Sequence, residues 1–223
     1  MKKTTRMKSI WIIGGGRFGK RAATLLRTRH PASEITVIEK DLQICRGLAK
    51  EAFHIECREG IRYLELNLKS IGTPDWIVPA IPLHVAFEWI RVKLSQDYDL
   101  HSLDISASLQ TVLPNPMAGG RGQIFVSNAD FICPENCSEP DEICTVTGRP
   151  RPRILHEFLA QIHAEEFTSV VICSRQMAAG VGGYPPRALF EALGKIKSAG
   201  RPVLLSTACR CHGISNLFTI SQK

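Results

Sequence analysis

What the sequence lacks already excludes several classes of protein. No apolar stretch approaches the roughly 20 residues that a membrane-spanning helix needs. The first apolar run after the basic start of the chain, at 10–13, has only four residues before Gly14, which is too short for the apolar core of a secretion signal. We therefore expect a cytoplasmic protein without membrane insertion. In that compartment, the eight cysteines are better explained by metal binding, redox chemistry or core packing than by structural disulfides.

Further absences concern binding and chemistry. The net charge of +7 comes from scattered basic residues without a pattern of base-stacking aromatic residues, so the sequence does not predict nucleic-acid binding. No tyrosine is followed four residues later by a lysine, which excludes the mechanism of short-chain dehydrogenases. The paired C-x2-C knuckles of common structural zinc sites and the C-x-x-C-H motif of c-type haem are also missing.

Alternating strand and helix patterns predict the α/β fold class. We expect a Rossmann-like domain over residues 1–113, with a doubly wound, mainly parallel sheet. A cysteine-rich α/β region over 114–223 is expected to pack on the same sheet. Strands are expected at 10–13, 35–39, 54–57, 75–78, 123–127, 169–173 and 202–206. Helices are expected at 18–28, 85–94, 154–166 and 187–198, with another helix capped by Asp41, a less regular segment at 60–68 and turns over 114–122.

Three glycines between an apolar strand and a helix predict a dinucleotide-binding loop. Gly14, Gly16 and Gly19 fit the G-x-G-x-x-G spacing. The first glycine permits a tight turn, the second lets the backbone approach a pyrophosphate, and the third lets the helix pack against the sheet. The pyrophosphate would lie at the positive end of the helix dipole. Glu39, twenty residues after Gly19, would bind the ribose hydroxyls and favour NAD(H) over its 2′-phosphorylated form.

This stretch resembles the Rossmann domain of RCK-type potassium-transport regulators over about residues 8–50. The resemblance rests on Arg17-Phe18-Gly19, which ends the glycine loop, and on the acid–x–Asp pattern that starts at Glu39. It implies that a bound dinucleotide is surrounded by Gly14, Gly16, Arg17, Phe18, Gly19 and Glu39. The triple glycine is also similar to the NAD-binding domain of precorrin-2 dehydrogenases. A likeness between folds does not establish activity.

One histidine is a candidate acid or base. In a doubly wound sheet, ligands lie outside the carboxyl ends of the strands, near the point where the strand order reverses. The loop at 79–84 follows the fourth strand and is therefore expected to face the nicotinamide, which makes His84 a candidate catalytic residue. A histidine at the start of a helix without a chemical role is the other interpretation.

Five cysteines and a histidine lie on connections rather than on predicted core faces. They are Cys133, Cys137, Cys144, Cys209, Cys211 and His212. We interpret them as a candidate metal site, which leaves both zinc and an iron–sulfur cluster open. A redox-active set of thiols and the absence of any special role are the alternatives. Cys45, Cys57 and Cys173 lie within predicted helices or strands and are expected to pack in the core.

Together, these patterns favour an NAD(H)-binding redox protein, either an oxidoreductase acting on an unknown small molecule or a redox sensor. The cysteine site would exchange electrons, bind metal or hold the substrate. The first alternative is a non-enzymatic, nucleotide-sensing module of the RCK type, and the second is an enzyme similar to precorrin-2 dehydrogenase. The sequence does not decide whether the protein is an enzyme, and it is compatible with a homodimer.

Overall fold

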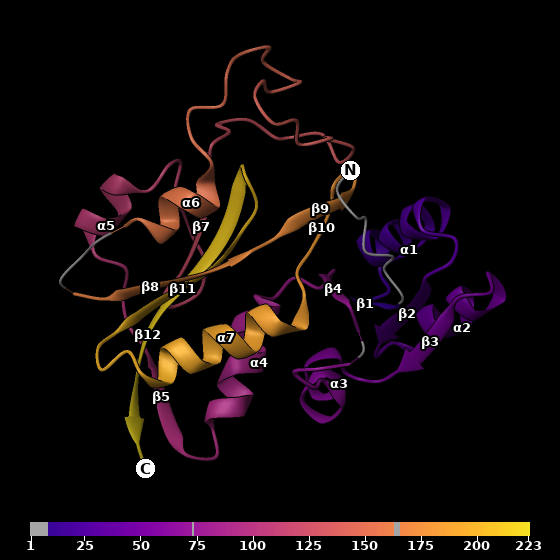
Figure 1. The fold of residues 1–223 in the computed structure, drawn as a ribbon, viewed down its shortest axis with the longest axis horizontal. Coiled ribbons are helices and arrows are strands. Elements are labelled where there is room, and N and C mark those ends of the chain that lie inside the picture. Colours follow the sequence, from indigo (N-terminus) through magenta and orange to yellow (C-terminus); the bar gives the residue numbers. More distant parts are fainter. Residues whose placement is uncertain (1–8, 73, 163–165) are drawn as a thin grey trace.

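The computed structural model describes residues 9–72, 74–162 and 166–223. Within these ranges the strands form two large sheets and one small hairpin, with helices between and outside the large sheets (Figure 1). No helix in this part of the chain is long and apolar enough to cross a membrane.

The first sheet is parallel and has the strand order β3-β2-β1-β4. Its strands are β1 (Ser9–Ile13), β2 (Glu34–Glu39), β3 (His54–Cys57) and β4 (Trp76–Pro79). Every residue of the central strand β1 is buried, as expected for a parallel sheet that is covered on both faces. The order, the parallel pairing and the buried centre agree with the predicted Rossmann-like fold.

The helices of this region are α1 (Arg17–Arg29), α2 (Leu42–Lys50), α3 (Gly60–Asn67) and α4 (Val85–Leu94). The predicted cap of α2 is confirmed, because Asp41 Oδ1 accepts hydrogen bonds from the next helical N–H groups at 2.7 and 3.2 Å. The expectation of a less regular segment at 60–68 is wrong, since α3 is a helix. Its cap is Glu59, and glutamate is not among the usual N-cap residues.

The second sheet is mixed and does not continue the first, contrary to the prediction. Its order is β6-β7-β12-β11-β8, and β5 also pairs with β12. The strands are β5 (Tyr98–Ser102), β6 (Met117–Ala118), β7 (Gln123–Ser127), β8 (Thr168–Cys173), β11 (Val203–Ala208) and β12 (His212–Gln222). The short strand β6 lies in the segment expected to contain only turns. The predicted division at residue 113 falls between β5 and β7, and both of these strands pair with β12.

Helices cover both faces of the second sheet (Figure 1). On one face lie α4 and α7 (Pro186–Lys197), and on the other lie α5 (Ala107–Val112) and α6 (Leu155–Ala160). The helix expected over 154–166 is shorter than predicted, and residues 163–165 lie outside the described ranges. One hydrophobic core contains residues of both sheets, among them Ile13 of β1, Trp89 of α4 and Phe218 of β12.

A hairpin connects the two regions. It consists of β9 (Arg175–Ala178) and β10 (Val181–Gly183). Just after it, Tyr184 exchanges two backbone hydrogen bonds with Ile77 of β4, at 2.9 and 3.0 Å. The hairpin therefore extends toward the edge of the first sheet and positions the second region against the first.

Two of the expected core cysteines form a disulfide. Cys45 of α2 and Cys57 of β3 are joined, with their Cα atoms 6.1 Å apart. Cys45 is buried as expected, whereas Cys57 is exposed. The expectation that core packing and not a disulfide explains these two cysteines is therefore wrong. The two residues lie on neighbouring elements of the first sheet region, which sequence spacing alone did not reveal.

Candidate dinucleotide and thiol site

The glycine loop has the geometry that a dinucleotide-binding loop requires. Gly14 has a φ of +108°, and a Cβ atom there would lie 2.8 Å from the carbonyl oxygen of Ala80. A Cβ atom at Gly19 would lie 1.8 Å from the carbonyl oxygen of Gly14, so α1 packs directly on the loop. At Gly16, by contrast, a Cβ atom would have no neighbour within 4 Å. The loop is thus open at the point where a pyrophosphate would approach, and these residues fit a bound dinucleotide.

Glu39 lies at the end of β2 beside this loop. Its Oε2 atom accepts a hydrogen bond from the Gly15 N–H at 2.6 Å, and its Oε1 atom accepts one from the Asp41 N–H at 2.9 Å. These contacts fix the carboxylate next to the glycines. A carboxylate has further acceptor positions, so Glu39 could still accept hydrogen bonds from ribose hydroxyls.

Arg17 links the glycine loop to the cysteine-bearing loop of the second region. The residue is in the first turn of α1, and its guanidinium lies 4.7 Å from the centre of the Phe18 ring. Its Nη2 atom is 2.5 Å from Glu135 Oε1. Glu135 lies between Cys133 and Cys137 in the sequence. The two candidate sites are therefore in direct contact.

A cavity of about 1210 Å³ lies between the two regions. Arg17, Phe18 and the loop after β4 line it from the first region. From the second region it is lined by all the predicted thiol-site residues: Cys133, Cys137, Cys144, Cys209, Cys211 and His212. The structure thus brings together side chains that the sequence places on two separate connections.

The hairpin between the regions anchors the cysteine loop. The backbone oxygen of Cys137 accepts hydrogen bonds from the Gly180 N–H at 3.0 Å and from Gln176 Nε2 at 2.7 Å. A Cβ atom at Gly180 would lie 1.7 Å from the backbone oxygen of Glu135. The glycine-rich segment at 180–183 therefore supports the cysteine loop.

Several sulfur atoms accept hydrogen bonds from backbone N–H groups. Cys137 Sγ accepts one from Glu139 at 3.4 Å, and Cys209 Sγ accepts two, both at 3.4 Å, from the residues two and three positions later. Hydrogen bonds from Thr147 and Val146 lower the pKa of Cys144. Such donors stabilise a thiolate, because they favour the charged form of the sulfur.

Burial acts in the opposite direction on the deeper thiols. It raises the pKa of Cys209 to about 12 and that of Cys211 to about 11. Arg151 opposes this effect at Cys211, since its Nη1 atom lies 3.0 Å from the sulfur. The pKa of Cys133 is raised by burial and by the neighbouring Cys137 and Cys144. At neutral pH, Cys133, Cys209 and Cys211 therefore carry their protons unless a cation is bound.

The predicted metal site is not assembled in this arrangement. Among the residues at 9–72, 74–162 and 166–223, no three His, Cys, Asp or Glu side chains are placed so that they could hold a metal ion together. The ligand set proposed from the sequence therefore shares one cavity, but its members do not converge on one point.

His84 does not face the cavity directly. Its side chain is buried, with 3% exposed. Its Nδ1 atom lies 2.6 Å from Asn216 Oδ1, and its Nε2 atom lies 2.9 Å from the hydroxyl of Thr207. Burial lowers the pKa of His84 to about 4, so the neutral ring donates to Asn216 and accepts from Thr207.

Thr207 lines the cavity and therefore lies between His84 and a ligand bound in the cavity. The sequence could not reveal this chain of hydrogen bonds, because Thr207 and Asn216 lie on β11 and β12, far along the chain from His84. Whether His84 acts as an acid or base stays a prediction.

Comparison with known proteins divides the chain in two. Residues 10–86 match the TrkA-N domain, and residues 86–221 match the family AF_1314_C, described as "Uncharacterized protein, C-terminal domain". An Archaeoglobus fulgidus protein described as "Uncharacterized protein" is 29% identical over 218 residues, which cover 91% of this chain and 95% of that protein. The predicted resemblance to RCK-type Rossmann domains is confirmed and extends beyond residue 50. TrkA-N domains bind NAD(H), so the first region is an NAD-binding domain.

Proposed function

The chain belongs to the AF_1314_C family and carries this domain behind a TrkA-N domain, and on that premise we propose that it is an NAD(H)-dependent redox protein. The observation that carries the proposal is the single cavity that Arg17 and Phe18 line together with five thiols. Bound NAD(H) would supply or accept a hydride. The cysteines that line the cavity are the second redox-active group in this proposal.

Each part of the first region has a role toward the dinucleotide. The open backbone at Gly16 and the start of α1 would receive the pyrophosphate, with Arg17 adding a positive charge. Glu39 would hold the adenosine ribose. The loop after β4, which lines the cavity through Pro79, Ile81 and Leu83, would face the nicotinamide end.

We propose further that the cavity thiols, which lie apart in the described arrangement, come together around an iron–sulfur cluster when one is bound. N–H groups bonded to the sulfur atoms of Cys137 and Cys209, and the guanidinium at Cys211, are the kind of hydrogen bonds that tune such clusters. The C-x3-C-x6-C spacing of the loop lacks the paired knuckles of zinc sites. Because the deeper thiols are protonated at neutral pH, cluster binding would release protons.

Anaerobic purification with absorption spectra and analysis of iron, sulfide and zinc tests this proposal. The wild-type protein is expected to contain iron and sulfide, and the triple variant Cys133→Ser, Cys137→Ser, Cys144→Ser is expected to lose both. Cys173→Ser is the matched control, because Cys173 lines a different pocket, and it should keep its cluster. Stoichiometric zinc without colour would contradict the cluster, and a metal-free wild-type protein would leave only thiol chemistry.

The RCK-type regulatory module is the second candidate function. The TrkA-N match and the Arg17–Glu135 contact favour it. Through that contact, nucleotide binding at the glycine loop would change the position of the cysteine-bearing loop of the second region. A regulator would bind NADH without oxidising it, whereas a redox protein would consume it. Cytoplasmic location and association into a homodimer stay predictions under both proposals.

A further inference from the structure

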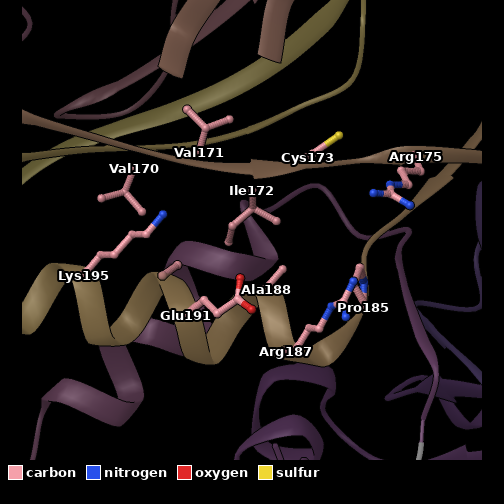
Figure 2. A pocket seen from close by; sticks show the side chains of 11 residues that line it. Val170, Val171, Ile172, Cys173, Arg175, Pro185, Arg187, Ala188, Glu191 and Lys195 are labelled. Atoms are coloured by element: carbon pink, nitrogen blue, oxygen red, sulfur yellow. The ribbon is translucent and has the colours of Figure 1, made fainter. Parts of the chain in front are cut away.

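A second pocket, of about 200 Å³, follows the open edge of β8 (Figure 2). In the sheet order β8 is terminal, because it pairs with β11 and, within the described residues, with no strand on its other side. Figure 2 shows Val170 and Ile172 directed toward α7, while Val171 and Cys173 point the other way. Side chains from both faces of β8 line the pocket, so it follows the strand edge.

This edge lacks the features that usually protect one. Natural edge strands carry proline, charged residues or bulges that prevent another strand from pairing. Residues 168–173 contain neither proline nor a charged side chain, and their register with β11 is regular. In a parallel pair, alternate residues direct their N–H and C=O groups away from the partner strand. The edge of β8 is therefore suited to accept an added strand.

The opposite wall of the pocket carries three charges in a regular pattern. Arg187, Glu191 and Lys195 follow each other at intervals of four residues on α7, and all three are exposed. None of them forms an ion pair with another described residue. Four residues of helix span about 6 Å, and alternate residues of a strand lie about 6.7 Å apart. An added strand that pairs with β8 could therefore place every second side chain opposite one of these three charged residues.

We propose that this edge binds an extended peptide segment of a partner protein with the pattern acid–x–base–x–acid. The segment would add a strand to β8 and place its acidic residues near Arg187 and Lys195 and its basic residue near Glu191. Because the pattern is symmetric, it fits either strand direction. The proposal does not depend on the redox function, since it uses neither the nucleotide nor the cavity thiols.

The charges also argue against a second copy of this chain as the occupant. If β8 paired antiparallel with β8 of a second copy, the end of the strand that lies near Lys195 in one copy would lie beside the end that is near Arg187 in the other (Figure 2). Cations would then face cations, and the two Glu191 side chains would lie at matching positions. Like charges placed opposite each other are destabilising.

Two fluorescein-labelled, capped peptides test the proposal on the full chain. The matching peptide is Ser-Glu-Val-Lys-Val-Glu-Ser, and the charge-reversed control is Ser-Lys-Val-Glu-Val-Lys-Ser. By fluorescence anisotropy at low ionic strength, the matching peptide is expected to bind at least about fivefold more tightly, since each exposed ion pair contributes only a few tenths of a kcal/mol. Hydrogen exchange should slow in residues 168–173 when the matching peptide is bound.

A charge-changing variant sharpens the test. Glu191→Lys should weaken the matching peptide about threefold, because one exposed ion pair is lost and one repulsion of similar size is gained. Glu157→Lys, on α6 at the opposite face of the sheet, should not change its affinity. Equal affinity for both peptides, with unchanged exchange in 168–173, would overturn the proposal. A dimer in light scattering that Val171→Lys dissociates would also overturn it, because a second copy would then occupy the edge.

Discussion

The two sheets assemble their candidate sites in different ways. In the first, the glycine loop and Glu39 follow neighbouring parallel strands, β1 and β2, so one βαβ unit supplies them all. In the second, the thiols come from a long loop and from the turn between β11 and β12. That turn lies beside the start of the loop because β7 pairs with β12, two strands far apart in the sequence. Spacing in the sequence therefore identifies a site well when one local unit builds it.

The largest expected effect is on the loop of the first region. Gly19→Ala would place a Cβ atom against the Gly14 carbonyl, so we expect a loss of about 4 kcal/mol in the free energy of unfolding. Gly194→Ala, in α7 of the second region, meets no atom within 4 Å and should gain about 0.5–1 kcal/mol. Urea unfolding measures both, and equal stability of the two variants would contradict the close packing of α1 on the loop.

The junction between the regions should be sensitive to acid. The folded-state pKa of His84, about 4, lies below its unfolded value of about 6.5. Between these values the unfolded chain binds the proton and the folded chain does not, so stability falls as pH falls from about 6.5 to about 4, by about 3 kcal/mol. Urea unfolding at several pH values measures this slope. It should be smaller in His84→Gln, and an identical slope in that variant would assign the effect to other groups.

Within the first region, Glu39→Gln should weaken NADH binding about tenfold, because hydrogen bonds from ribose hydroxyls to a charged acceptor are lost. Titration of NADH fluorescence measures the dissociation constant. Glu34→Gln, at the opposite end of β2, is the matched control and should bind normally. An unchanged constant for Glu39→Gln would remove the ribose-binding assignment.

The smallest effect is expected at the contact between the regions. Glu135→Gln should strengthen NADH binding about twofold, since Arg17 would no longer be paired with a carboxylate and its charge would favour the pyrophosphate. The gain should shrink as salt is added. Glu142→Gln, elsewhere in the cysteine loop, should have no effect, and weaker binding by Glu135→Gln would mean that the ion pair supports the loop instead.

The fold of the first region could be predicted because its strands are short apolar runs. The strands β5 and β12 were missed because they contain many polar residues, some of which are buried. Ser215 and Asn216 of β12 have their partners in Ser206, at 2.7 Å, and His84. A polar residue whose hydrogen bond comes from a distant strand resembles a loop residue in the sequence.

The candidate site shows the same limit. The placement of Gly14, Gly19 and Glu39 around one loop could be predicted from their spacing, since all three lie within one βαβ unit. The Arg17–Glu135 contact and the chain from Thr207 to His84 could not, because only the packing of the two sheets creates them. The disulfide of Cys45 and Cys57 likewise depends on how α2 lies beside β3.

The most direct test of the central claim, that the two regions exchange electrons, is an anaerobic titration of the full chain with NADH. The account predicts that the near-ultraviolet absorption of reduced nicotinamide is lost while the visible absorption of the thiolate-bound cluster bleaches, with two clusters each taking up one electron and one proton released to solvent for every NADH oxidised. If NADH binds, remains reduced and leaves the visible spectrum unchanged, the claim is contradicted and the protein is better described as a nucleotide-sensing regulator.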